Sequence, residues 1–145
     1  RLRRYFPGCA LTADMITGFP GETEADQATA VEFLEQVGFA AVHVFPYSRR
    51  PGTKADAMPE QLSHAVKSAR AHEAQRAADA CKQRYLAQQV GRILPVLFET
   101  EHDGNWVGHS DNYCLVRVAG DDLRGLVKNV KISAVSGQML VGDLV

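Results

Sequence analysis

The residue types best suited to ligand chemistry stand at two junctions that follow apolar runs. Residues 13–23 read Ala-Asp-Met-Ile-Thr-Gly-Phe-Pro-Gly-Glu-Thr, so a β-branched and apolar run leads into Gly18, Phe19, Pro20 and Gly21. Two glycines and a proline at a strand-to-helix junction allow the backbone to turn sharply and to lie close to a ligand. The pattern predicts a ligand-binding loop, with a capped, ligand-free turn as the alternative.

The second junction, residues 44–55, reads Val-Phe-Pro-Tyr-Ser-Arg-Arg-Pro-Gly-Thr-Lys-Ala. Ser48, Arg49 and Arg50 follow the apolar run directly. A guanidinium binds a carboxylate or a phosphate through paired hydrogen bonds, and ligand sites of parallel barrels lie at the carboxyl ends of the strands. The two junctions together predict one end of a catalytic barrel, with solvated arginines in a Pro-Gly loop as the alternative.

The elements that must position these junctions form a strand–helix–strand pattern. Residues 9–17 fit a strand, and Thr23 with Asp26 resembles the capping box that opens a helix. Gly38 supplies the helix stop. The nearly all-apolar residues 39–45 then predict a parallel strand buried on both faces. This is the repeating unit of an α/β sheet or barrel.

A long helix and a small barrel are predicted after the second junction. No Gly or Pro interrupts the chain between Pro59, placed for the first turn, and Gly91, which predicts one helix over 59–90. The hydrophobic period then changes to about two residues, which indicates strands. The predicted strands are 93–99, 105–109, 113–118, 126–135 and 138–145. They favour a small, partly open antiparallel barrel of the oligonucleotide-binding type.

Composition excludes several classes of protein. The net charge of −1 gives no global field that would attract nucleic acid. No apolar run approaches the length of about 20 residues that spans a bilayer, so we expect no membrane partner and a cytoplasmic location. The three widely separated cysteines argue against a disulfide framework and predict no metal or iron–sulfur ligand set.

Three segments, taken in order, resemble the radical-SAM methylthiotransferases. They are residues 14–23, residues 45–53 (Phe-Pro-Tyr-Ser-Arg-Arg-Pro-Gly-Thr) and the closing residues 139–145 (Met-Leu-Val-Gly-Asp-Leu-Val). The last module resembles the TRAM domain of that family, a barrel that binds RNA or substrate. The sequence of residues 45–53 is most similar to that of the branch that acts on threonylcarbamoyladenosine in tRNA. Sister branches act on isopentenyladenosine or on an aspartate of a ribosomal protein.

The resemblance implies an α/β plus all-β fold in which the chain is the C-terminal portion of a longer transferase. Residues 1–58 would be the last part of the radical-SAM barrel, residues 59–90 a connecting helix and residues 91–145 the TRAM domain. The family uses S-adenosyl-L-methionine (SAM) and two 4Fe-4S clusters, one of them on a Cys-x-x-x-Cys-x-x-Cys loop. That loop is missing from this sequence. We therefore expect no catalytic residue or cluster ligand here, and no activity from the chain alone.

The resemblance also assigns a cofactor site at the two junctions. Ile16 would pack on the adenine of SAM, beside the turn formed by Gly18, Phe19, Pro20 and Gly21. The residues after the second strand would complete the site. These are Ser48 and Arg49 toward SAM, and Arg50 toward an acidic part of the substrate such as the threonyl carboxylate.

RNA contacts are assigned to the last module, where the charge is unfavourable. Residues 91–145 contain five basic and seven acidic side chains, whereas phosphate binding needs local positive charge. Arg117, Lys128 and Lys131 are predicted to contact RNA from one face, with Trp106, His109 and Tyr113 as stacking surfaces. Packing of Trp106 in the barrel core is an equal alternative.

The expected partner of the parent enzyme is the anticodon stem-loop of tRNA. A protein substrate, as in the ribosomal-protein branch, and a stand-alone RNA-binding module without catalysis remain the alternatives. Two strands cannot close a barrel, so their edges and one apolar face should be exposed. That exposure predicts dimerisation, aggregation or disorder within residues 1–58, while the last module folds alone.

Overall fold

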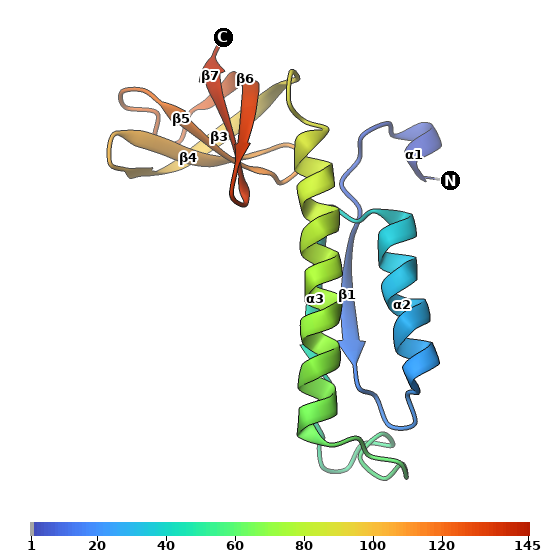
Figure 1. The fold of residues 1–145 in the computed structure, drawn as a ribbon. Coiled ribbons are helices and arrows are strands. Elements are labelled where there is room, and N and C mark those ends of the chain that lie inside the picture. Colours follow the sequence, from blue (N-terminus) through green and yellow to red (C-terminus); the bar gives the residue numbers. More distant parts are fainter. Residues whose placement is uncertain (1) are drawn as a thin grey trace. The chain divides into compact units, whose positions relative to one another are not determined.

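The computed structural model describes residues 2–145; Arg1, the first residue of the predicted 1–58 segment, lies outside them. Leu11–Lys82 forms one compact unit, and the segment up to Ala10 with Gln83–Val145 forms the other. The elements, labelled in Figure 1, are α1 (Leu2–Tyr5), β1 (Thr12–Thr17), α2 (Glu24–Val37), β2 (Ala41–Pro46), α3 (His64–Ala87), β3 (Ile93–His102), β4 (Asn105–Ser110), β5 (Leu115–Ala119), β6 (Val127–Ser136) and β7 (Met139–Leu144). The predicted division into 1–58, 59–90 and 91–145 stays a prediction.

The first unit begins with the predicted strand–helix–strand pattern. Strands β1 and β2 pair in parallel, and α2 connects them. The Asp26 N–H donates to Thr23 Oγ1 at 3.1 Å and the Thr23 N–H donates to Asp26 Oδ2 at 2.9 Å, which forms the predicted capping box. Hydrogen bonds from the side chain and backbone of Thr23 lower the pKa of the Asp26 carboxyl. Gly38, with φ at 61°, ends the helix as predicted.

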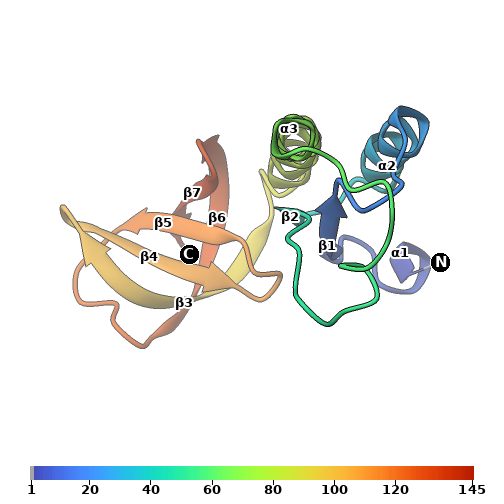
Figure 2. The ribbon, with the colours of Figure 1, turned by 90° about the horizontal axis from the view of Figure 1, so that it is seen from below.

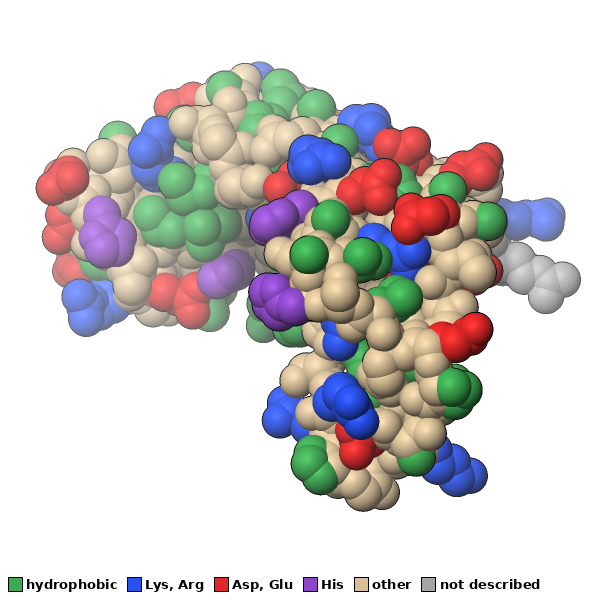
Figure 3. Space-filling model, turned by 60° about the horizontal axis from the view of Figure 1, so that its bottom comes forward, with side chains coloured by type: hydrophobic (Ala, Val, Ile, Leu, Met, Phe, Trp, Pro, Cys, Tyr) green, Lys and Arg blue, Asp and Glu red, His purple; other side chains and the backbone are tan. Residues whose placement is uncertain are grey.

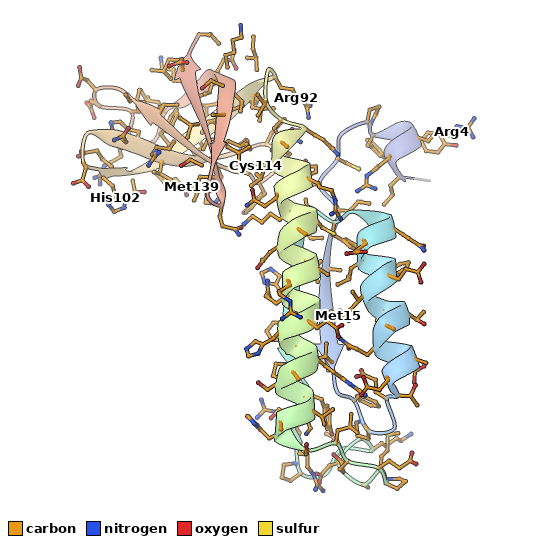
Figure 4. All side chains as sticks on the ribbon, viewed as in Figure 1. Arg4, Met15, Arg92, His102, Cys114 and Met139 are labelled. Carbon is orange, nitrogen blue, oxygen red and sulfur yellow. The ribbon has the colours of Figure 1, made fainter. Side chains whose placement is uncertain are left out.

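Both helices of this unit cover one side of the β1–β2 pair (Figures 1 and 2). The core there contains Leu34, Phe39, Val42 and Ala78, and Met15 packs against it beneath the helices (Figure 4). The opposite face is solvent-exposed.

The exposed face of the β1–β2 pair corrects the prediction that residues 39–45 are buried on both sides. Ile16 is 57% exposed and its register partner Phe45 is 52% exposed, while His43 is also exposed. The cause is the one-sided placement of α2 and α3. This exposed apolar face was expected of a two-stranded sheet, whereas dimerisation through it stays a prediction.

Helix α3 begins later than predicted. Glu60 has a positive φ of 59°, so the backbone near Pro59 is not helical. Ser63 precedes the helix, and its hydroxyl accepts the Val66 N–H at 3.3 Å. This side-chain cap moves the start to His64, because a serine hydroxyl satisfies a first-turn amide that Pro59 alone cannot. No helix within residues 2–145 combines the length and the apolar character that crossing a membrane requires.

The second unit contains a closed five-stranded barrel with the strand order β3-β4-β5-β7-β6. Four pairings are antiparallel, and β5 pairs with β7 in parallel. The expectation of an antiparallel, partly open barrel is therefore wrong in these two respects. A closed ring with an odd number of strands cannot alternate direction throughout, so one parallel pair is unavoidable. The small, oligonucleotide-binding-like barrel itself is as predicted.

Two glycines permit the long strands to bend and close the barrel. β3 carries a bulge between Phe98 and Thr100, where it crosses Gly108 of β4. A Cβ on Gly108 would overlap the Leu97 carbonyl and lie 2.8 Å from the Cα of Phe98. Gly142 meets the Lys131 carbonyl of β6 in the same way, beside the second bulge. Bulges and glycines at such corners are how small barrels turn.

We predict that Gly108→Ala destabilises the barrel by about 2 to 3 kcal/mol, because the added methyl group meets backbone that cannot move aside. Gly120→Ala is the matched control, since the atom nearest to its added methyl group is a side-chain atom, Leu123 Cδ1 at 3.2 Å, and not backbone. The measurement is the urea midpoint of barrel unfolding. Equal midpoints for both variants would contradict this account of closure.

Candidate functional site

The loop that follows β1 has an unusual backbone at both of its glycines. Gly18 has φ at 71° and Gly21 has φ at 81°, a region that favours glycine. Pro20 is buried, and Phe19 is 40% exposed. The Glu22 N–H donates to the Phe19 carbonyl at 3.0 Å. The loop is therefore a tight turn with one aromatic side chain at its surface.

The glycine requirement at Gly18 has a structural cause that the sequence did not reveal. A Cβ at this position would lie 2.6 Å from Lys67 Cγ and 3.2 Å from Lys67 Cα, because α3 packs directly on the loop. The sequence predicted that a ligand would lie close to this glycine. On this side of the loop, a helix of the same unit occupies that space.

Arg70 of α3 fixes the same loop by an ion-pair network. Its side chain is 6% exposed, and Nη1 lies 2.6 Å from Glu22 Oε1 while Nη2 lies 2.7 Å from Glu24 Oε1. Nη1 also donates to the Glu22 carbonyl at 2.9 Å. The hydrogen bonds to Glu24 and Glu22 raise the pKa of Arg70 against the opposing effect of burial.

Glu22 transmits this constraint to the glycine turn. Its Oε1 atom, paired with Arg70, accepts the Gly18 N–H at 2.9 Å. A carboxylate that accepts a backbone N–H and a guanidinium together is a strong, directional anchor. The shape of the loop is therefore fixed by contacts within the chain.

Sequence reasoning did not assign Arg70, Lys67 or Glu22 to the shape of this loop. A signal for Arg70 existed in the spacing. It lies four residues before the buried Ala74, which lies four residues before the buried Ala78, so Arg70 falls on the buried stripe of α3. A charged residue on such a stripe needs a buried partner.

An aromatic contact connects the two junctions. The Phe19 and Tyr47 rings lie 5.2 Å apart in an edge-to-face arrangement, and Lys67 Nζ lies 5.1 Å from the centre of the Tyr47 ring. The Tyr47 N–H donates to the Thr17 carbonyl at 2.8 Å. The predicted convergence of the two strand ends is therefore present.

Two hydroxyl groups at this end of the sheet lack partners within residues 2–145. They are Thr17 Oγ1 and Tyr47 OH, both buried. A buried hydroxyl without a hydrogen bond costs about 1 to 3 kcal/mol. Ile16 and Phe45 form an exposed apolar row on the face of the β1–β2 pair opposite to Thr17, because successive side chains of a strand alternate between its faces.

The second junction is partly engaged within its own loop. Arg49 Nε lies 2.7 Å from Asp56 Oδ1, and Arg49 Nη2 donates to the Asp56 carbonyl at 3.0 Å. Arg49 is 56% exposed, so this pair contributes less than about 1 kcal/mol, and an anion can displace it. Ser48 and Arg50 are exposed.

The barrel places the predicted RNA-binding residues apart. Trp106 is 6% exposed and points inward on β4, so the burial favours core packing over the stacking role. Arg117 lies between Val107 and Val141 on the outer surface of β5.

Lys128 and Lys131 lie on β6, where Lys131 faces Asp143 of β7. Strand β7 separates them from Arg117, so the register does not gather the three cations on one face. On the side of the molecule in Figure 3, lysine and arginine side chains are likewise scattered among acidic ones.

The residues described do not fit an iron–sulfur cluster. Within residues 2–145, no three His, Cys, Asp or Glu side chains gather as a metal site requires. Cys81 and Cys114 are buried, and Cys9 is half-buried.

A glycine-turn loop at the end of a parallel strand pair, followed by an oligonucleotide-binding-like barrel, agrees with the class that the motifs indicated. Comparison with known proteins confirms the resemblance: the chain is homologous over essentially its whole length to tRNA methylthiotransferases. No family model matches it.

Three relatives illustrate the match. The threonylcarbamoyladenosine tRNA methylthiotransferase MtaB of Bacillus subtilis is 37% identical over 91% of this chain and 31% of its own length. The tRNA-2-methylthio-N(6)-dimethylallyladenosine synthase of Maricaulis maris is 40% identical over 99% of the chain and 32% of its own length. The synthase of the same name from Campylobacter jejuni (strain 81-176) is 36% identical over 100% of the chain and 34% of its own length. The chain thus spans about a third of the length of these relatives.

We predict that Arg70→Met destabilises the α/β unit by about 3 to 5 kcal/mol, because it leaves the Glu22 carboxylate, 15% exposed, without its cation. Glu24→Gln is the matched control. Its side chain is 87% exposed, so its loss should cost less than about 1 kcal/mol. Urea unfolding followed by helical circular dichroism measures both. A similar cost for the two variants would show that Arg70 is not a buried anchor.

Proposed function

We propose that the chain is the C-terminal part of a tRNA methylthiotransferase that modifies threonylcarbamoyladenosine beside the anticodon. The main support is the whole-chain similarity to enzymes named for tRNA methylthiolation, at 36 to 40% identity for the three relatives above. The convergence of the two loop junctions at one end of the β1–β2 pair supports a cofactor site there. The cytoplasmic location remains part of this proposal.

SAM is the cofactor that the β1–β2 end would help to bind. When bound, SAM supplies the methyl group and, with a cluster held outside this chain, the radical that starts sulfur insertion. The exposed side chains of Ile16 and Phe45 would pack against the adenine and exclude water from it. Gly18, Phe19, Pro20 and Gly21 would form the wall beside it, and Ser48 and Arg49 would provide a hydroxyl and a guanidinium for its polar end.

Arg50 is the residue that we assign to substrate choice. Its exposed guanidinium stands in the loop after β2, on the same side as the proposed cofactor wall. Threonylcarbamoyladenosine carries a carboxylate, which a guanidinium recognises through charge-assisted hydrogen bonds. A dimethylallyl group is apolar and gains nothing from this residue. Both kinds of relative match the chain at similar overall identity, which does not separate the two branches. We assign the choice of substrate to Arg50 because of its charge.

A protein substrate is the second candidate, favoured by the excess of acidic over basic side chains in residues 91–145. An acidic barrel repels RNA phosphates and tolerates a basic ribosomal protein. The same experiment separates the two candidates.

The test expresses the gene of the proposed longer enzyme, of which this chain would be the C-terminal part, in a bacterial strain without methylthiotransferases of its own. Mass spectrometry of tRNA nucleosides should detect methylthiolated threonylcarbamoyladenosine. Arg50→Ala should lower its yield about tenfold or more, as expected for loss of one charge-assisted bond. Arg76→Ala, an exposed arginine of α3, is the matched control and should leave the yield unchanged.

Three results would contradict the proposal in different ways. Methylthiolated dimethylallyladenosine would assign the chain to the sister branch. A methylthiolated aspartate in a ribosomal protein would support the protein substrate. RNA binding without any modification would favour a stand-alone binding module.

A further inference from the structure

In the turn between β4 and β5, Tyr113 has a strained backbone and an exposed side chain. Tyr113 has φ at 62°, a left-handed conformation that is a genuine outlier for a bulky side chain. Its side chain is also 83% exposed. Burial therefore does not compensate for the strain. Strained residues of this kind persist where the surrounding structure imposes them, and they concentrate at functional sites.

Hydrogen bonds within the turn impose this conformation. The Tyr113 N–H donates to the Ser110 carbonyl at 2.9 Å. Ser110 Oγ donates to Asn112 Oδ1 at 2.6 Å and accepts the Cys114 N–H at 3.0 Å. Ser110 and Cys114 are buried, so the turn has a rigid base beneath the exposed ring.

Asn112 anchors that base to the last turns of α3 within the same unit. Its Nδ2 atom donates to Tyr85 OH and to Gln89 Oε1, each at 3.1 Å. The Tyr85 hydroxyl in turn donates to the Gly8 carbonyl at 3.0 Å. Burial raises the pKa of Tyr85, so its phenol stays a donor. This polar network specifies the backbone that presents Tyr113.

A second ring stands beside the tyrosine. The His109 and Tyr113 rings lie 5.4 Å apart at 41°, and His109 Nδ1 lies 2.6 Å from Glu99 Oε2, which fixes the imidazole. His109 of β4 pairs with Leu115 of β5 on the outer surface of the barrel. Arg117 lies two residues after Leu115 on β5, on the same face. These are the second and third strands of the barrel, the surface by which oligonucleotide-binding barrels contact single strands.

We propose that Tyr113, with His109, is a stacking site for one unpaired base of an RNA loop, and that Arg117 contacts the adjoining phosphate. The proposal rests on tRNA being the substrate, as proposed above, and it locates the base contact away from the buried Trp106. Stacking tolerates any base, because every base has a flat apolar face. Arg117 would provide a single anchoring contact to phosphate in a barrel whose acidic side chains outnumber its basic ones.

The test uses the full chain and a hairpin RNA of anticodon stem-loop size with 2-aminopurine in its loop. The fluorescence of this base falls when it stacks on a ring. Wild-type protein should bind the hairpin and quench the fluorescence. Tyr113→Gly should weaken binding about 5- to 100-fold and abolish quenching. The melting temperature should not fall, since glycine accepts the positive φ without strain.

Two variants complete the design. Tyr113→Phe keeps the ring and should retain binding and quenching, because the hydroxyl plays no part in stacking. Tyr5→Ala removes another exposed tyrosine, 72% exposed in α1, and should change neither signal.

The outcomes separate this inference from the proposed function. Wild-type binding that Tyr113→Gly leaves intact overturns the stacking site and leaves the enzyme assignment untouched. Failure of the wild-type chain to quench the loop base also overturns it, as does binding of a ribosomal protein through Tyr113 in place of RNA. Quenching that depends on Tyr113, together with absence of methylthiolated nucleoside in cells, supports the stacking site and contradicts the proposed enzyme.

Discussion

The buried ion pair between Arg70 and Glu22 is the interaction on which the arrangement of the α/β unit depends. One carboxylate oxygen receives both the guanidinium of α3 and the Gly18 N–H of the loop after β1. The same helix packs Lys67 closely against Gly18, which further restricts the loop. A site that is preformed in this way binds its ligand without spending free energy on ordering the loop. The exposed row of Ile16 and Phe45 is the surface that we propose for the ligand.

The barrel follows from a different constraint, the parity of its strands. Five strands that close into a ring must include one parallel pair, and here it is β5 with β7. The resulting order leaves β4 and β5 with an outer face that carries Arg117 and His109, while the lysines lie across β7. The distribution of charge is therefore a consequence of topology. With so few basic residues, the barrel would need an aromatic stacking contact in order to bind RNA.

Local patterns in the sequence predicted most elements, because the relevant interactions are local. The Thr23–Asp26 capping box, the Gly38 stop and the period-two strands all depend on neighbours a few residues away. The site could be predicted only in part. The Gly-Phe-Pro-Gly motif indicated a tight loop, yet the partner of Gly18 lies on a helix about fifty residues later, which no local pattern reports. The inward direction of the Trp106 side chain likewise depends on the strand register, which the local sequence does not determine.

Amide hydrogen exchange at Gly18 in the ligand-free 145-residue protein tests the central claim most directly. The account predicts slow exchange of this N–H in the wild type, because the Arg70–Glu22 pair holds it. Exchange should become fast in Glu22→Ala, while amides in the barrel stay protected. Fast exchange of Gly18 in the wild type, slowed only after SAM is added, would contradict the account, since the loop would then be shaped by its ligand.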